Sequence, residues 1–351
     1  MSTRTGLLSI VAVAALAACS NQAPSSTQST PVPAPTSSVT TTAPSPSSAS
    51  SEPMTADANG VKGGKVTVAT ALYPIEWLTK EIGGDHVAIT NLVAPGQDAH
   101  HIELSPSQVQ EVMDADMVIH FNGLAPAFDD AAAKSQGKAV DLRQLIRLEL
   151  ADHDDHDDHD DHDDGDDDHD DHDHDHDLGG VDPHFWLDPD ELADLAPKLA
   201  EALSEQDPAN AAMYRENATR IASTLDARDD EWDRRLDRCT IKPFVTTHAA
   251  FGYLADAYDL RQIGIKGLDP DAEPTPERLN AIREEISRAG VTTVFTEPSA
   301  TTALAESIAQ DLNIQVATLD PLESLSPDSP GKDYLEVMQA NIDALAKANN
   351  C

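Results

Sequence analysis

The sequence predicts an α/β protein built from two similar lobes, each with a parallel sheet, joined by a long helix. From Lys65 onward, short apolar runs alternate with amphipathic segments, which is typical of parallel strands covered by helices. A helical pattern ending near Arg238 interrupts this alternation, which then resumes. A helix of about thirty residues spans roughly 45 Å, more than one small domain needs. The two halves share no visible sequence repeat.

The residues before the folded part predict export and attachment to a membrane. Arg4 precedes a short apolar run, Leu7 to Ala18, which is too short to span a bilayer as a mature helix. The run ends in Leu-Ala-Ala followed by Cys19, which resembles a bacterial lipobox; an ordinary signal peptide is the alternative. We expect a signal peptide over 1–18 and a Ser/Thr/Pro-rich tether over 19–60, held by lipidated Cys19 at the extracytoplasmic face of the cell membrane.

The first lobe is expected over residues 65–205. Its strands are predicted where short apolar runs occur, at Val66–Thr70, Val87–Val93, Met117–Phe121 and Ala139–Val140. Its helices are predicted at Ile75–Ile82, Gln108–Asp114 and Glu191–Leu203. Ser105 or Ser107 is suited to cap the second helix, because a serine hydroxyl accepts a hydrogen bond from a free N–H of the first turn.

The linking helix is expected over 206–238, with Pro208 in its first turn. The second lobe, over 239–351, has predicted strands at Phe244–Thr247, Val291–Thr296 and Gln315–Leu319. Its predicted helices lie at Phe251–Tyr258, Leu279–Ser287, Ala303–Leu312 and Tyr334–Ala348. Cys239 and Cys351 form an even pair in an exported chain, which favours a disulfide. A cysteine metal site is the alternative, although nothing near either residue has ligand spacing.

The charge indicates that cations are the ligand class. The formal net charge is −40, and the stretch 152–177 contributes 17 Asp, so the remainder still carries −23. Nucleic acid is excluded as a partner, because phosphate binding needs a basic face.

The stretch 152–177 consists of Asp and His with a single Gly, and it contains no apolar side chain. Such a tract cannot offset the entropy of ordering, so we expect it to be disordered by itself. His-rich composition is typical of metal binding, and Asp adds hard oxygen ligands; a solvated acidic linker is the alternative. We interpret the tract as an auxiliary collector of metal through its histidines: His153, His156, His159, His162, His169, His172, His174 and His176.

Three histidine-bearing segments outside the tract lie at strand ends or in loops. They are 95–106 (Pro-Gly-Gln-Asp-Ala-His-His-Ile-Glu-Leu-Ser-Pro), 182–189 (Asp-Pro-His-Phe-Trp-Leu-Asp-Pro) and 246–253 (Thr-Thr-His-Ala-Ala-Phe-Gly-Tyr). In open α/β sheets, ligands bind beyond the carboxyl ends of strands. His248, Glu297 and Asp320 each follow a predicted strand closely. Any one of these histidines could be a capping or buried residue; three of them together favour a metal site.

These three segments resemble the zinc-binding lipoproteins of bacterial ABC importers, the ZnuA-like (cluster A-I) solute-binding proteins. The resemblance covers Lys65 to the end, and the segment at 182–189 is its most specific part. The resemblance implies that His100, His184 and His248 are metal ligands, with His101 as the alternative to His100. It maps the fourth ligand to Asp320, with water or another carboxylate as alternatives. It places Glu297 as a hydrogen-bond acceptor for a ligand.

The same resemblance implies a metal site in the cleft between the lobes, with the His/Asp tract as a loop beside it. We therefore expect an extracytoplasmic receptor, acting as a monomer, that captures Zn²⁺ and delivers it to an ABC permease and its ATPase. Three imidazoles suit tetrahedral zinc, whereas the manganese-selective relatives carry a carboxylate at the third position, which here is His248. Manganese or another divalent metal is the nearest alternative.

Two other classes of protein fit the sequence less well. Three histidines and an open position also describe a zinc hydrolase, but the sequence has no His-Glu-x-x-His helix and only Glu297 as a candidate base. A surface metal buffer or adhesin without a transporter is the other possibility. We expect no enzymatic activity.

Overall fold

The structure is a computed structural model that describes residues 64–148, 180–298 and 302–351. All of them belong to one compact unit, Ala56–Cys351. The predicted signal peptide, Cys19, the tether and the His/Asp tract at 152–177 lie outside the described residues. Within the described ranges, no helix combines the length and apolar character that a membrane crossing requires.

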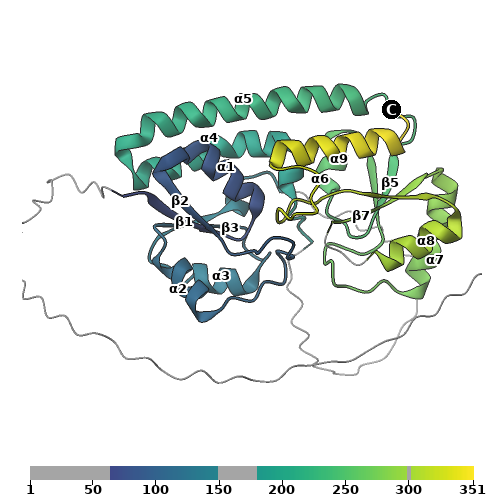
Figure 1. Cartoon of the computed structure of the whole chain (residues 1–351), viewed down its shortest axis with the longest axis horizontal. Helices are drawn as coiled ribbons and strands as arrows, with labels where there is room; N and C mark the ends of the chain where they lie inside the picture. Colours follow the sequence, from purple (N-terminus) through teal and green to yellow (C-terminus); the bar gives the residue numbers. More distant parts are fainter. Residues whose placement is uncertain (1–63, 149–179, 299–301) are drawn as a thin grey trace, which may run out of the picture. The chain divides into compact units, whose positions relative to one another are not determined.

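The first lobe contains a four-stranded parallel sheet in the order β2-β1-β3-β4 (Figure 1). Its strands are β1 Val66–Thr70, β2 Val87–Asn91, β3 Met117–His120 and β4 Lys138–Asp141. Its helices are α1 Tyr73–Gly83, α2 Pro106–Asp114 and α3 Pro126–Ala132, with 3-10 turns at Gly84–His86 and Leu142–Gln144. Ser105 caps α2 with a reciprocal capping box to Gln108, which selects between the two serines that the sequence offered.

The second lobe repeats this topology with the strand order β6-β5-β7-β8, again all parallel. Its strands are β5 Pro243–Thr246, β6 Arg261–Gly264, β7 Thr293–Thr296 and β8 Gln315–Thr318. Its helices are α6 Gly252–Ala257, α7 Pro276–Ala289, α8 Ala303–Leu312 and α9 Tyr334–Ala348. Two parallel-sheet lobes of equal strand order confirm the predicted fold class.

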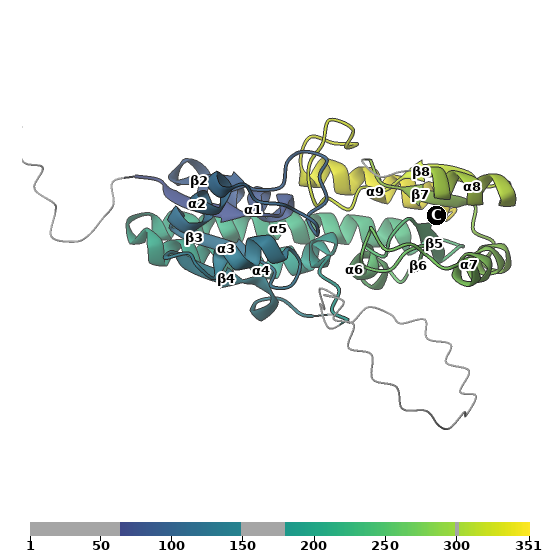
Figure 2. The same cartoon turned by 90° about the horizontal axis from the view of Figure 1, so that it is seen from below.

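Two long helices lie side by side along the molecule, and the second of them joins the lobes (Figure 1 and Figure 2). They are α4 Pro189–Gln206 and α5 Ala211–Leu236, with 3-10 turns at Phe185–Leu187 before α4 and Pro208–Asn210 before α5. Helix α5 is 26 residues long. Near its start, Asn217 donates to the carbonyl of Ile82 at the end of α1; near its end, Trp232 donates to Gln339 on α9. One helix is therefore fastened to both lobes.

The sequence missed β6 and α3. Helix α3 is seven residues long, too short for a helical period to show in the sequence. Strand β6 is an edge strand with a single fully buried apolar residue, Ile263, so its sequence Arg-Gln-Ile-Gly has little strand character. Both elements are held by tertiary contacts that propensity does not encode.

The C-terminus is fixed to the second lobe by covalent and hydrogen bonds. Cys239 and Cys351 form a disulfide across a sequence separation of 112 residues, which confirms the predicted pairing. Ile241 donates its N–H to the carbonyl of Asn349 beside it. The end of α9 is thus tied to the residues that follow α5.

Candidate metal centre

The candidate site lies where the carboxyl ends of strands from both lobes meet the segment that precedes α4. His100 comes from the loop after β2, and His248 lies two residues after β5. His184 directly precedes the turn that leads into α4, and Glu323 lies in the loop after β8. Contributions from both sheets follow from the rule that open α/β sheets bind ligands at these ends.

The four side chains form a compact group, called here the inner cluster. Nε2 of His100 and Nε2 of His184 are 3.4 Å apart. Oε1 of Glu323 lies 3.7 Å from Nε2 of His100, 3.5 Å from Nε2 of His184 and 3.6 Å from Nε2 of His248. Zn–N and Zn–O bonds near 2.05 Å put tetrahedral ligands about 3.3 Å apart. The four donor atoms lie within 4.8 Å of one another, so small shifts would bring them around one ion.

The inner cluster is almost completely shielded from water. The exposed fractions are 0% for His184, 1% for His248, 6% for Glu323 and 9% for His100. Nε2 of His248 has no hydrogen-bond partner although it is buried. A buried imidazole nitrogen without a partner is costly unless it binds something.

His184 is oriented by Asp182, two residues earlier in the chain. Oδ1 of Asp182 lies 2.7 Å from Nδ1 of His184 and also accepts the backbone N–H of His184. A Cβ on Gly252 would lie 2.6 Å from Oδ2 of Asp182, so glycine is required where α6 begins. Burial opposes the charged form of His184, but the Asp182 carboxylate outweighs burial and raises the pKa of this histidine. The Nε2 atom is left facing the inner cluster.

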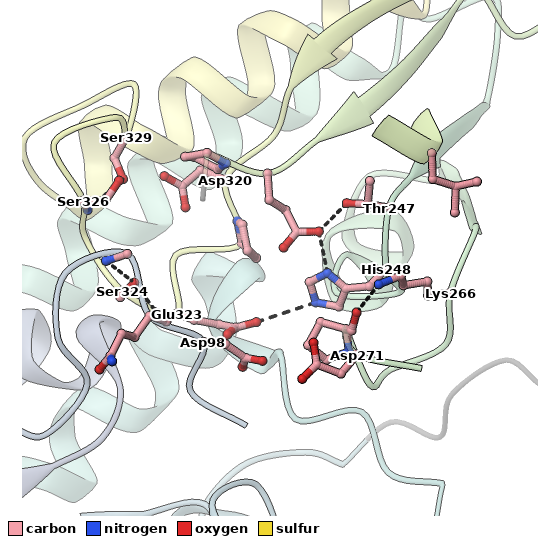
Figure 3. A pocket seen from close by; sticks show the side chains of 17 residues that line it. Asp98, Thr247, His248, Lys266, Asp271, Asp320, Glu323, Ser324, Ser326 and Ser329 are labelled. Carbon is pink, nitrogen blue, oxygen red and sulfur yellow. Dashed lines mark hydrogen bonds and ion pairs between the residues drawn. The ribbon is translucent and has the colours of Figure 1, made fainter. Parts of the chain in front are cut away.

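The carboxylate of Glu297 orients His248 in the same way. Nδ1 of His248 lies 2.7 Å from Oε1 of Glu297, which also accepts the hydroxyl of Thr247. Burial disfavours charge on His248, yet Glu297 and Glu323 outweigh it and raise the pKa of His248 to about 10. Figure 3 shows the ring of His248 directed toward Glu323. The carboxylate of Glu297 lies at the other ring nitrogen. A carboxylate behind a histidine fixes its tautomer and makes it a better ligand.

The other two members of the inner cluster differ in charge: His100 is neutral and Glu323 is anionic at neutral pH. Burial lowers the pKa of His100 to about 4, so its ring is neutral and ready to coordinate at neutral pH. Burial favours a neutral Glu323, but the nearby imidazoles of His184, His248 and His100 outweigh it and hold the pKa of Glu323 well below its usual value. The cluster thus offers one anionic oxygen among three imidazoles.

Asp320, to which the sequence assigned the fourth ligand position, does not join this cluster. Its Oδ1 accepts the backbone N–H of Leu322, and its backbone is held by Asn341. Leu322, which has a positive φ of 62°, turns the chain toward Glu323, three residues after Asp320. The sequence offered one signal for Glu323: it is an acidic residue in the same Asp-Pro-Leu-Glu loop.

His100 and His101 are separated clearly. His100 lies in the inner cluster, whereas His101 has an exposed side chain that faces Asp98 and Asp271. Of the predicted site residues, the structure therefore brings His100, His184 and His248 together and places Glu297 behind His248. The tract histidines and Cys19 lie outside the described residues.

The segment around His184 is held between the lobes. Nε1 of Trp186 donates to the carbonyl of Pro321, and the hydroxyl of Tyr334 donates to the carbonyl of Trp186, each at 2.7 Å. Trp77 of the first lobe stacks on Tyr334 with ring centroids 4.7 Å apart. The Asp-Pro-His-Phe-Trp-Leu-Asp-Pro segment is therefore fixed in place by buried contacts next to its histidine.

Two parallel-sheet lobes, long connecting helices and a buried cluster of three histidines and one glutamate between the lobes define the class of two-lobed solute-binding proteins. The family model described as "ZnuA: Zinc-uptake complex component A periplasmic" matches residues 68–348. The chain belongs to this family.

Curated relatives and solved structures agree with this assignment. The chain is 30% identical over 299 residues to the zinc-binding lipoprotein AdcA of Streptococcus pneumoniae TIGR4, covering 82% of this chain and 56% of that protein. It thus spans about half the length of that relative. It is 30% identical to the high-affinity zinc uptake system protein ZnuA of Bacillus subtilis 168, covering 81% of this chain and 88% of that protein. The Zn(II)-bound ZnuA-like domain of Streptococcus pneumoniae AdcA matches with a TM-score of 0.65 and 28% identity, covering 82% of this chain and all of the domain (100%).

Proposed function

We propose that this protein is an extracytoplasmic receptor that captures Zn²⁺ and delivers it to an ABC permease and its ATPase. The observation that carries the proposal is the inner cluster: three buried imidazoles and one buried carboxylate converge on one point. Three nitrogen ligands and one oxygen suit tetrahedral zinc, whereas manganese prefers more oxygen ligands. The zinc-related names of the relatives support the same cargo.

The ligands are His100, His184, His248 and Glu323, with Asp182 and Glu297 as hydrogen-bond acceptors behind two of the histidines. Glu323 takes the place of Asp320 in this proposal. Because His100 and His248 belong to different lobes, separation of the lobes would break the coordination shell. This provides a route for release to the permease.

The donor set supports a carrier rather than an enzyme. A catalytic zinc keeps one position for water or substrate, whereas a structural or stored ion has a closed shell of four protein ligands. Glu323 fills the fourth position of the inner cluster. We therefore propose that the protein makes and breaks no covalent bond in its cargo.

The signal peptide, lipidated Cys19 and tether complete the proposal as a lipid anchor outside the cytoplasmic membrane, with the folded unit acting as a monomer. The family description places its members in the periplasm, and one relative is named a lipoprotein. The tract over 152–177 would raise the local zinc concentration through weak, rapidly exchanging sites.

Zinc titration tests this proposal. The full chain is titrated by competition with a chromophoric chelator beside a variant lacking 152–177, and one tight site is expected to survive the deletion. In the deletion background, His184→Ala should lower the affinity of that site by well over tenfold. His86→Ala, an exposed histidine of the first lobe, is the matched control. Loss of the tight site with the tract, or unchanged affinity in His184→Ala, contradicts the proposal.

A further inference from the structure

A second group of metal-ligand side chains lies beside the inner cluster. Nδ1 of His101 is 3.1 Å from Oδ2 of Asp98 and 3.5 Å from Oδ2 of Asp271. These three donor atoms lie within 4.8 Å of one another. We call Asp98, His101 and Asp271 the outer cluster. Its side chains are accessible, with exposed fractions of 31%, 39% and 76% respectively.

The outer cluster draws on both lobes, as the inner cluster does. Asp98 and His101 belong to the loop between β2 and α2, whereas Asp271 belongs to the loop between β6 and α7. Residues far apart in the sequence therefore converge on one imidazole. A surface histidine that contributes only to solubility needs no such convergence.

The geometry of the outer cluster fits a coordinated ion. Its distances of 3.1 and 3.5 Å bracket the separation of about 3.3 Å expected between tetrahedral zinc ligands. With Nδ1 of His101 directed at the two carboxylates, Nε2 lies 3.8 Å from Oδ1 of Asp269. At that separation Asp269 adds negative charge beside the ring without a hydrogen bond, unlike the 2.7 Å contacts that orient His184 and His248 in the inner cluster.

The charge balance also favours a cation. Three carboxylates face a single imidazole, so even a protonated His101 leaves the group negative. Lys266 lines the same pocket and contributes one positive charge, its ammonium group donating to the carbonyl of Pro270. A divalent ion would neutralise the remaining charge.

The two clusters share one pocket. A cavity of about 270 Å³ is lined by Asp98 and Asp271 of the outer cluster and by His248 and Glu323 of the inner cluster (Figure 3). The buried Nε2 of His248, which has no hydrogen-bond partner, belongs to this lining. The cavity thus leads from exposed donors to a buried donor without a partner.

Asp98 connects the two clusters directly. Its Oδ2 faces His101, while its Oδ1 accepts the backbone N–H of His100 at 2.6 Å. The rings of His100 and His101 have centroids 6.3 Å apart. An ion that moves from the outer to the inner cluster therefore travels only the short distance between two neighbouring histidines of one loop.

We infer that Asp98, His101 and Asp271 form an outer zinc site, with Asp269 behind the histidine, where an arriving ion is held before it reaches the inner cluster. This inference rests on the proposed zinc-receptor function. Because the outer cluster is exposed, its zinc exchanges rapidly, and its role is kinetic. The inner dissociation constant depends only on the free and inner-bound states, so loss of a waypoint slows association and dissociation by the same factor.

Anomalous diffraction at the zinc edge tests whether the outer cluster binds zinc. Crystals of the full chain are equilibrated with excess ZnCl₂, and two peaks are expected among the described residues: one at each cluster. His101→Asn should remove the outer peak and keep the inner one, which also shows that the variant is folded. His86→Asn should keep both.

The outcomes separate the two proposals. An inner peak alone in the unaltered chain overturns the outer site and leaves the receptor function standing. Absence of zinc from the inner cluster overturns the receptor function instead. An outer peak that persists in His101→Asn overturns the assignment of His101 as a ligand.

Stopped-flow exchange with a chromophoric chelator tests the kinetic role in the same full-chain variants. His101→Asn should slow both zinc uptake and zinc loss at the tight site by roughly tenfold, because loss of its imidazole weakens the outer site by at least that factor. Its dissociation constant should match that of the unaltered chain. Unchanged rates overturn the role of the outer cluster as a waypoint.

Discussion

His100 and His101 are neighbours in the chain, yet they belong to two clusters with opposite surroundings. His100 is 9% exposed and meets two other histidines and Glu323. The side chain of His101 is 39% exposed and faces the carboxylates of Asp269 and Asp271, which are exposed themselves. One loop therefore carries one donor into the interior and leaves the next in water.

The difference shows what makes a metal site tight. In the inner cluster, carboxylates fix the rings of His184 and His248 before any ion arrives, so little entropy is lost on binding. Attraction between ion and ligand is also stronger where water is excluded. In the outer cluster, water competes for every donor, which makes it suited to rapid exchange.

The largest effect is expected from the inner carboxylate. Glu323→Gln removes the anionic ligand and should weaken zinc binding on the order of a hundredfold, at least as much as loss of a supporting residue does. Asp320→Asn is the matched control, because an amide oxygen can still accept the N–H of Leu322. Competition titration of the chain lacking 152–177 measures both. Equal losses in the two variants would return Asp320 to the ligand set.

A smaller, graded effect is expected from pH. Because the pKa of His248 is raised to about 10 in the metal-free protein, zinc must displace a proton from this ring at neutral pH. The affinity of the inner cluster should therefore fall about tenfold for each unit that the pH is lowered between 9 and 7. Calorimetry in buffers of different ionisation enthalpy measures the released proton. Affinity that is flat over this range would show that His248 is already neutral.

The sequence predicted the fold and three of the four side chains that meet in the inner cluster, because both follow from local patterns. Apolar runs followed by helical periods located β1, β3 and β8, and strand ends located His248 and Glu297. The sequence did not decide between the adjacent histidines His100 and His101, and it pointed to Asp320 rather than to Glu323 three residues later. Which of His100 and His101 turns inward depends on how Asp98 and Glu323 hold the loop backbone. The Asp98 contact is local, but Glu323 accepts the N–H of Ala99 from 224 residues away.

The choice of Glu323 over Asp320 as the proposed fourth ligand has a similar cause. Asp320 lies two residues after the last strand, β8, which is where the topology rule directs attention. The residue is instead used in the turn, where it accepts the N–H of Leu322, and the longer side chain of Glu323 reaches the histidines. The positive φ of Leu322 that makes this turn possible is unusual for a leucine, so no sequence pattern indicates it.

The most direct test of the central claim is a long-range ¹H–¹⁵N correlation spectrum of the histidine rings in the full chain with one equivalent of zinc. The expected result is that His100, His184 and His248 show zinc-bound Nε2 signals, while the eight histidines of 152–177 keep their metal-free positions. His184 and His248 should carry their ring proton on Nδ1, facing Asp182 and Glu297. Shifts at the tract histidines with the first equivalent, and none at these three, would contradict the account.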